Sequence, residues 1–201
     1  MRALSTIVSL ALVTALAACT ESHTTTTDGS VADTGTLPPD LTACDVPSVC
    51  ALRSRSCCGS CGEPTASDMV AVRVDRLDVY AGIACGAPPV ACPACAGMPD
   101  PYLLATCGTS GLADRHCIPV NLHTDPLTEC SVDTDCTLGP RTCCACGSLT
   151  NLDTIAYNPA HGSLGALTCD PDLTCPPCAP DFGMLFAACD AGRCVARYPT
   201  R

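Results

Sequence analysis

Short stretches of hydrophobic residues alternate with long polar runs rich in Pro and Gly, so few and short regular elements are expected. Residues 69–74 alternate with β-branched side chains and predict a strand, with a weaker counterpart at 154–157. A short helix is expected over residues 75–84. Its counterpart is expected to begin at Asn158-Pro159, because an N-cap residue followed by Pro favours a helix start.

Further apolar stretches stand near the end of each half of the chain. Residues 103–106 and 184–188 predict strands that lead into terminal hairpins. The second hairpin has a credible two-residue turn within Asp190-Ala191-Gly192-Arg193. The hydrophobic pattern therefore predicts a small α+β fold with short strands, a short helix and much loop.

Cysteine spacing repeats along the chain of 201 residues, which contains 21 cysteines. Each half opens with two spaced cysteines and an adjacent doublet, continues through a Cys-Pro-x-Cys step, and closes with two cysteines around a polar turn. Ten matched cysteines in order indicate a duplication. The first set is Cys44, Cys50, Cys57, Cys58, Cys61, Cys85, Cys92, Cys95, Cys107 and Cys117, and the second is Cys130, Cys136, Cys143, Cys144, Cys146, Cys169, Cys175, Cys178, Cys189 and Cys194.

We expect two tandem cysteine-rich modules, at residues 44–120 and 129–201, joined by a polar junction at 121–128. Aromatic residues make up only 3% of the chain and Trp is absent, so neither module can bury a large core. Ten structural disulfides, five per module, are expected to replace it. The spacing of the cysteines does not determine which of them pair. The adjacent cysteines of each doublet are not expected to bond to each other.

The N-terminus has the features of an export signal. Met1-Arg2 is followed by an apolar run over residues 3–16, which is too short to span a bilayer and is typical of a signal peptide. Leu16-Ala17-Ala18-Cys19 then resembles the lipobox of bacterial lipoproteins. The resemblance implies that residues 1–18 are removed and that Cys19 becomes the lipidated first residue. The alternative is an ordinary signal peptide, with Cys19 a stray thiol.

Residues 19–43 are expected to form a lipidated Cys and a flexible, Thr-rich linker, because they are polar and without periodicity. Thr20, rather than Asp, follows the lipidated Cys, and in the lipoprotein family this implies sorting to the outer membrane. The membrane is therefore an expected partner through lipid on Cys19. Nucleic acid is not, because the formal net charge is −10 and nucleic-acid binding needs a basic surface.

A second resemblance concerns the doublets. The segment from Cys130 to Cys136 followed by Cys143-Cys144 is similar to the centre of whey acidic protein-type four-disulfide cores, and Cys57-Cys58-Gly59-Ser60-Cys61-Gly62 is similar to the same region. In that family the first and third of these cysteines pair. The resemblance therefore implies Cys44–Cys57 and Cys130–Cys143 bridges.

Other candidate sites are open to more than one interpretation. Arg55 and Arg141 each stand two residues before a doublet, where an arginine either packs its stem over the disulfides or presents a binding loop to a trypsin-like protease. The Cys-Pro-x-Cys steps could be structural, redox-active or zinc-binding. We expect the remaining candidates to be solvated side chains: His23, His116, His123, His161, Asp133, Asp135, Asp170 and Asp172.

The sequence therefore predicts a lipoprotein of the bacterial cell envelope that displays binding or structural modules to an unknown envelope or extracellular ligand. No catalytic residue, metal or cofactor is expected. A protease inhibitor that acts through the Arg55 or Arg141 loop is one alternative function. A thiol-disulfide oxidoreductase is the other.

Overall fold

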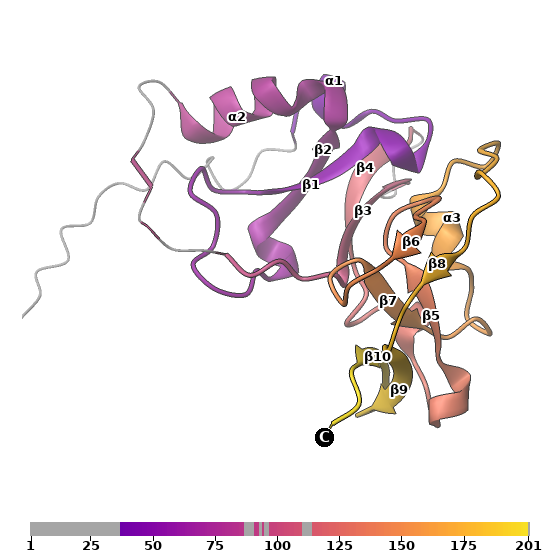
Figure 1. Ribbon diagram of the computed structural model, residues 1–201. Helices are drawn as coiled ribbons and strands as arrows, with labels where there is room; N and C mark the ends of the chain where they lie inside the picture. The colour runs from indigo at the N-terminus through magenta and orange to yellow at the C-terminus, as the bar shows by residue number, and fades with distance from the viewer. Residues whose placement is uncertain (1–36, 87–90, 93, 95–96, 110–113, 201) are drawn as a thin grey trace, which may run out of the picture.

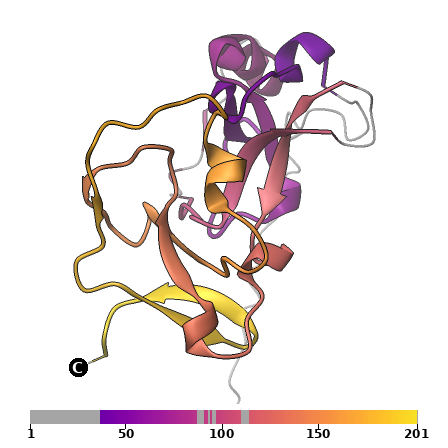
Figure 2. The ribbon, with the colours of Figure 1, turned by 90° about the vertical axis from the view of Figure 1, so that its right-hand side faces the viewer.

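The computed structural model describes residues 37–86, 91–92, 94, 97–109 and 114–200. The two halves of the chain lie beside each other as two small units, with helices α1 and α2 at one end of the molecule and the C-terminal hairpin at the other (Figure 1). Long loops make up much of the second unit (Figure 2). The structure confirms the small disulfide-rich α+β class.

The elements follow a similar order in both halves. The first half contains α1 (Pro39–Thr42), β1 (Cys50–Ser54), β2 (Met69–Arg73), α2 (Leu77–Cys85), β3 (Leu103–Gly108) and β4 (His116–Asn121). The second contains β5 (Thr137–Pro140), β6 (Gly147–Ser148), β7 (Thr154–Tyr157), α3 (Leu164–Thr168), β8 (Pro180–Asp181), β9 (Phe186–Asp190) and β10 (Arg193–Arg197). Short 3₁₀ turns lie at Pro47–Val49, Ala66–Asp68, Val74–Arg76, Pro126–Thr128 and Asp133–Asp135.

Each half is built on two antiparallel strand pairs. β1 pairs with β2 and β3 with β4 in the first half, and β5 pairs with β7 and β9 with β10 in the second. A short parallel pair, β6–β8, joins two loops of the second half. The predicted strands and the terminal hairpins are therefore confirmed. No helix in the described part of the chain is long and apolar enough to cross a membrane.

The disulfides follow one connectivity in both modules. The first cysteine bonds to the ninth, the second to the tenth, the third to the sixth and the fourth to the seventh, and in the second module the fifth bonds to the eighth. Nine bridges join described residues: Cys44–Cys107, Cys50–Cys117, Cys57–Cys85, Cys58–Cys92, Cys130–Cys189, Cys136–Cys194, Cys143–Cys169, Cys144–Cys175 and Cys146–Cys178. Cys61 is also disulfide-bonded, whereas Cys95 lies outside the described residues.

This connectivity shows that the bridges implied by the whey acidic protein resemblance, Cys44–Cys57 and Cys130–Cys143, are wrong. Each terminal hairpin returns to the start of its module, where its two cysteines meet the first two. The Cα atoms of the first bridge are 5.8 Å apart in both modules. Each doublet instead lies at the end of the short helix, where Cys57 and Cys143 find their partners.

The repeat begins before the first cysteine of each module. Both modules carry Leu-Thr-x-Cys, and Leu41 and Leu127 are the buried members, with exposed fractions of 1% and 5%. Both stand in a single helical turn, α1 in the first module and Pro126–Thr128 in the second. Order therefore extends into the end of the segment expected to be linker (19–43), because Leu41 needs an apolar environment.

The two short helices differ in where they begin. The helix predicted over residues 75–84 is α2, but its counterpart α3 starts at Leu164 and not at Asn158-Pro159. Asn158 has a different role, because its side chain donates to the Glu129 carbonyl at 2.8 Å and accepts from the Ala160 amide at 3.0 Å. These two hydrogen bonds hold the residues after Asn158 in a turn, and the helix therefore begins only at Leu164.

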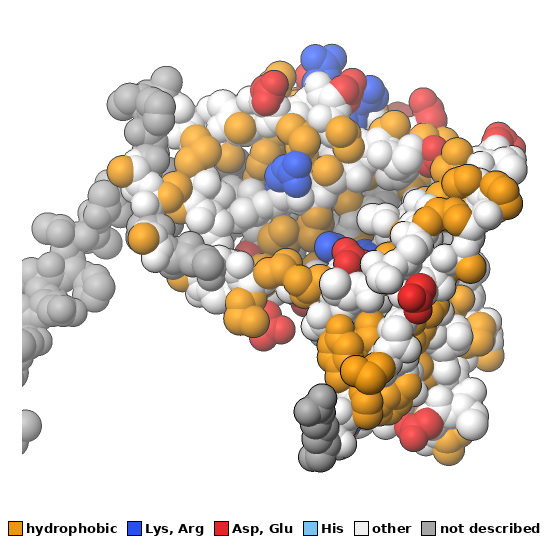
Figure 3. All heavy atoms as spheres, viewed as in Figure 1, with side chains coloured by type: hydrophobic (Ala, Val, Ile, Leu, Met, Phe, Trp, Pro, Cys, Tyr) orange, Lys and Arg blue, Asp and Glu red, His pale blue; other side chains and the backbone are white. Residues whose placement is uncertain are grey.

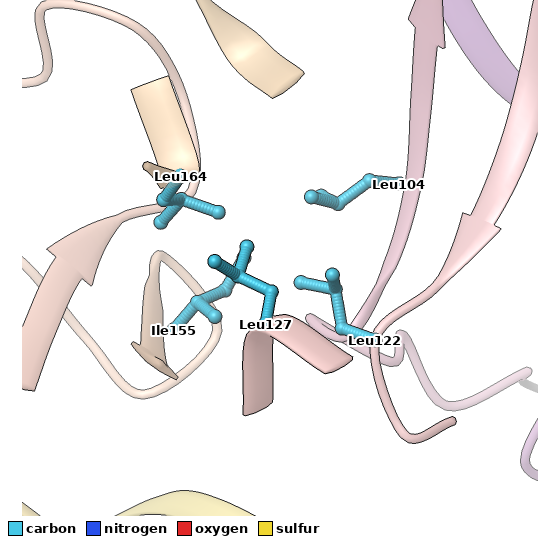
Figure 4. Close-up of a cluster of buried hydrophobic side chains, with 5 residues drawn as sticks. All are labelled: Leu104, Leu122, Leu127, Ile155 and Leu164. Atoms are coloured by element: carbon cyan, nitrogen blue, oxygen red, sulfur yellow. The ribbon is translucent and has the colours of Figure 1, made fainter. Parts of the chain in front are cut away.

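The largest apolar cluster lies between the two modules (Figure 4). Leu104 of the first module and Leu122 of the connecting segment face Leu127, Ile155 and Leu164 on the side of the second module, and all five are buried. Tyr102, Val120, Tyr157 and Leu167 pack around them, partly buried. The modules therefore share a core, and neither one completes it alone.

Polar contacts reinforce the interface between the modules. The Tyr102 hydroxyl accepts hydrogen bonds from the amides of Ala156 and Ala196, at 3.4 and 3.1 Å. The Asp170 carboxylate accepts from the backbone and the hydroxyl of Ser48, at 3.0 and 2.6 Å. These bonds fix the orientation of one module on the other.

Candidate functional site

The two cysteines of a Cys-Pro-x-Cys step do not bond to each other. In the second module Cys175 bonds to Cys144 and Cys178 bonds to Cys146, so neither step closes on itself. In the first module Cys92 bonds to Cys58. Each described cysteine of these steps therefore forms a disulfide that holds a loop against the region of the doublet.

Neighbouring disulfides stack closely in both modules. Four groups of three cysteine sulfurs lie within 4.8 Å of one another: Cys44, Cys50 and Cys117; Cys57, Cys58 and Cys92; Cys130, Cys136 and Cys194; and Cys143, Cys144 and Cys175. Each group contains both halves of one disulfide and one sulfur of the next. The close spacing thus reflects cross-link packing, since a disulfide sulfur offers no thiolate for a metal.

The two arginines proposed as binding loops have different environments. The Arg55 side chain is exposed and its Nε donates to the Ser67 carbonyl at 3.1 Å. Arg141 is half-buried and its Nη2 donates to the Leu103 carbonyl of the first module at 3.0 Å. Burial lowers the pKa of Arg141. The half-buried position of Arg141 favours the interpretation in which its stem packs against the protein over that of a displayed binding loop.

An open hollow of about 600 Å³ lies in the second module, between the terminal hairpin turn and the start of the module. Its size falls within the range of small-molecule sites, but its walls are mainly polar. It combines residues from four separate segments of the chain. The lining residues are Glu129, Cys130, Ser131, Asp135, Asn158, Ala160, His161, Ala191, Gly192 and Arg193.

Arg193 joins two walls of the hollow. It begins β10 and forms a bridge with Glu129 across the hairpin edge. Its Nη1 donates to the Asp125 carbonyl at 2.7 Å and to the Thr128 hydroxyl at 3.3 Å, and its Nη2 lies 3.6 Å from the Glu129 carboxylate. The guanidinium therefore fixes the loop that leads into the first cysteine.

Asp135 is held in its ionised form. The backbone N–H of Ser131 and then that of Val132 donate to its carboxylate, at 2.7 and 3.0 Å, and both lower the pKa of Asp135. The nearby His161 adds a smaller effect in the same direction. A carboxylate fixed by backbone donors is a permanent acceptor at neutral pH.

His161 contributes a second acceptor. Its Nδ1 lies 2.7 Å from the Pro126 carbonyl, which can only accept, so Nδ1 carries the proton. In the neutral ring Nε2 is then an acceptor. Ser131 lines the same hollow, but among the described contacts no hydrogen bond joins its hydroxyl to His161. The walls thus match a ligand rich in hydrogen-bond donors better than a nucleophilic reaction.

Two members of this polar set have apolar counterparts in the first module. The residue before the first cysteine is Glu129 in the second module and Ala43 in the first, and the residue before the second cysteine is Asp135 and Val49, respectively. The scaffold around them is the same, because Arg73 donates to the Ala43 carbonyl at 3.1 Å as Asn158 does to Glu129. The Glu129 and Asp135 carboxylates are therefore additions to a frame that the two modules share.

Sequence reasoning missed this set. Asp135 and His161 were expected to be solvated, Asn158 was expected to cap a helix, and Arg193 was expected only as part of the hairpin turn. Glu129 had no predicted role. The available signal was the difference between aligned modules, in which Glu129 and Asp135 replace Ala43 and Val49 directly beside cysteines. The hairpin turn beside the hollow was predicted, and Ala191 and Gly192 have φ values of 48° and 79°, as a tight hairpin turn requires.

Comparison with family models, with curated proteins and with solved structures finds no match for this chain. The location of the protein is therefore inferred from its disulfides. Each cysteine in the described part of the chain is disulfide-bonded, and disulfides at this density persist in oxidising compartments. The chain is an extracytoplasmic protein of two disulfide-stabilised repeats.

Proposed function

We propose that this protein is a lipoprotein of the bacterial cell envelope, anchored through lipid on Cys19, whose two-module head binds a ligand without catalysis. The observation that carries the proposal is the cysteine count. The repeated scheme uses ten cysteines in each module, and of the 21 in the chain only Cys19 has no place in it. That cysteine stands at the end of a lipobox, and both it and the segment 1–18 lie outside the described residues.

Lipidation is tested by expressing the full chain in a bacterium with two membranes. We expect the mature protein to begin at Cys19 with diacylglycerol on its sulfur and an acyl group on its amine, which together anchor a protein durably. Mass spectrometry of the N-terminal peptide measures both, and outer-membrane fractionation gives the location.

The matched variant is Cys19→Ala, which keeps every cysteine of the repeats. It is expected to leave the membrane fraction while retaining the same disulfide map. An unmodified N-terminal peptide containing Cys19 would contradict the anchor and leave an ordinary exported protein.

The proposed binding site is the hollow of the second module. Its acceptors, the Asp135 carboxylate and the His161 Nε2, match the hydroxyl and amino groups of an envelope glycan. The open shape and the loop-lined walls suit part of a long polymer. The apolar counterparts of Glu129 and Asp135 in the first module, Ala43 and Val49, support a ligand role, because the shared frame does not need the two carboxylates.

Binding is tested by titrating soluble peptidoglycan fragments into the protein and following amide chemical shifts by NMR. We expect shifts confined to the walls of the hollow, and a loss of affinity of about tenfold or more in Asp135→Asn or His161→Ala, since each removes an acceptor. Asp172→Asn is the charge-matched control on an exposed loop of the same module and should bind like the wild type. Equal binding by all three variants would exclude the hollow.

A further inference from the structure

The hollow of the second module carries more negative than positive charge. Its lining includes the carboxylates of Glu129 and Asp135, the guanidinium of Arg193 and the imidazole of His161. With the imidazole neutral, two negative charges stand against one positive charge. The formal net charge of the whole chain is −10, so the rest of the protein does not offset this local excess. On the face of the molecule in Figure 3, red carboxylates are visible over the second module, whereas the blue arginines lie mainly over the first.

Arg193 is committed to the fold and leaves Glu129 largely available. Its Nη1 donates to the Asp125 carbonyl and to the Thr128 hydroxyl, at 2.7 and 3.3 Å. Its Nη2 lies 3.6 Å from the Glu129 carboxylate, which is longer than a hydrogen bond. The Glu129 side chain is 51% exposed. A ligand that enters the hollow therefore meets a carboxylate whose hydrogen-bonding capacity is not taken up by Arg193.

Asp135 presents a second carboxylate in a fixed position. The backbone N–H groups of Ser131 and Val132 both donate to its Oδ2. Its Oδ1 accepts no hydrogen bond from any residue that the structure describes. Because the protein itself already fixes the carboxylate, a ligand that binds Oδ1 does not bear the cost of ordering this side chain.

The available side chains of the hollow match a cation. Glu129 and Asp135 can only accept hydrogen bonds, and the Nε2 of His161 is a further acceptor when the ring is neutral. A hydroxyl donates one hydrogen and carries no charge, whereas a primary ammonium group donates three and is positive. Hydrogen bonds between charged partners are about twice as strong as those between neutral ones. A phosphate or carboxylate group would instead be repelled by both carboxylates.

We propose that the hollow selects a primary ammonium group of its envelope ligand, held by Glu129, Asp135 and the Nε2 of His161. This inference rests on the ligand role proposed above and specifies the chemical group that is recognised. Peptidoglycan can offer such a group in two places, on an amino sugar that has lost its acetyl group or on the side chain of a diamino acid in the stem peptide. Both sources share the same chemistry, and the experiment separates them.

The experiment compares free amines with their acetylated forms, using the full chain carrying Cys19→Ala so that no lipid is present. One pair of probes is a peptidoglycan disaccharide-tripeptide that ends in lysine, with its side-chain amine free or acetylated. The other pair is a glucosamine oligosaccharide and its N-acetylated form. Amide chemical shifts give the affinity. For at least one pair we expect the free amine to bind about tenfold or more tightly than the acetylated probe, and to weaken as salt rises. The pair that shows the preference identifies the source.

Glu129→Gln provides the matched variant, because it removes the charge and keeps the shape of the side chain. It should weaken binding of the free amine by about tenfold or more and leave binding of the acetylated probe unchanged, so that the substitution and the acetylation are coupled. Asp172→Asn, on an exposed loop of the same module, should change neither. A disulfide map confirms that each variant has folded.

Two results would overturn the inference while leaving the proposed binding role in place. One is equal affinity for free and acetylated probes in both pairs. The other is a loss in Glu129→Gln that is the same for both forms, which would give Glu129 a role in the shape of the hollow only. If no probe, free or acetylated, shifted the walls of the hollow, the proposed binding role itself would fall and the inference with it.

Discussion

Reduction of its disulfides is expected to unfold this protein completely at neutral pH. The apolar clusters are small, since the largest contains five buried side chains and spans both modules. The two outer bridges of each module close loops of 58 to 67 residues, and each such loop contributes about 4 kcal/mol by restricting the unfolded chain. Four of them together exceed the net stability of about 5–15 kcal/mol that typical domains have.

The expected result is a loss of near-ultraviolet circular dichroism and of any cooperative thermal transition in reductant. Removal of single bridges should lower the free energy of unfolding by amounts that differ from bridge to bridge. Cys136→Ala with Cys194→Ala removes a bridge whose second sulfur is buried (Cys194 is 1% exposed), so we expect a loss of about 4 kcal/mol or more. Cys144→Ala with Cys175→Ala removes an exposed bridge with a shorter loop and should cost less.

A fully reduced, metal-free protein that kept its native circular dichroism would show that the apolar clusters suffice. The comparison needs alkylated thiols, so that no bridge reforms during the measurement. The alkylated protein in denaturant provides the unfolded baseline.

Truncation of Leu122 is expected to lower the free energy of unfolding by about 2–5 kcal/mol, as for other buried Leu→Ala changes. Leu122 is fully buried, with an exposed fraction of 0%, although it lies in the connection between the modules. Its side chain faces Leu127 and Ile155, so the change opens a cavity in the core that the modules share (Figure 4). Chemical denaturation with intact disulfides measures the loss.

Leu173→Ala is the matched control, because Leu173 is 50% exposed on a loop of the second module. It should change the free energy of unfolding by less than about 0.5 kcal/mol. If Leu122→Ala had an equally small effect, the two modules would be independent domains joined by a passive connection.

The strands could be predicted from the sequence because each one depends on a pattern of neighbouring residues. Alternation at residues 69–74 and apolar residues before a hairpin turn depend only on neighbours, and the strands formed where they were expected. The helix start at Asn158-Pro159 also had a local signal, but it was wrong. There the Asn158 side chain binds a carbonyl 29 residues away, and this contact outweighs the capping preference.

Long-range pairing could not be read from spacing. The similarity of the doublet region to another family suggested bridges within the first 15 residues of each module, whereas the structure joins Cys44 to Cys107 across a separation of 63 residues. The inward position of Arg141 depends on the second module meeting the first. The burial of Leu41 could not be predicted for a different reason. A single apolar residue at the end of a polar segment does not form a periodic hydrophobic pattern.

The long sequence separation of the outer bridges has a consequence for biogenesis. In the proposed export through an N-terminal signal peptide, Cys44 and Cys50 reach the oxidising side well before Cys107 and Cys117, their native partners. An oxidase that joins cysteines in order of arrival would link them to the nearby doublet instead. We therefore expect correct maturation to depend on a disulfide isomerase that reopens early bridges, so that secretion yield follows the supply of that enzyme.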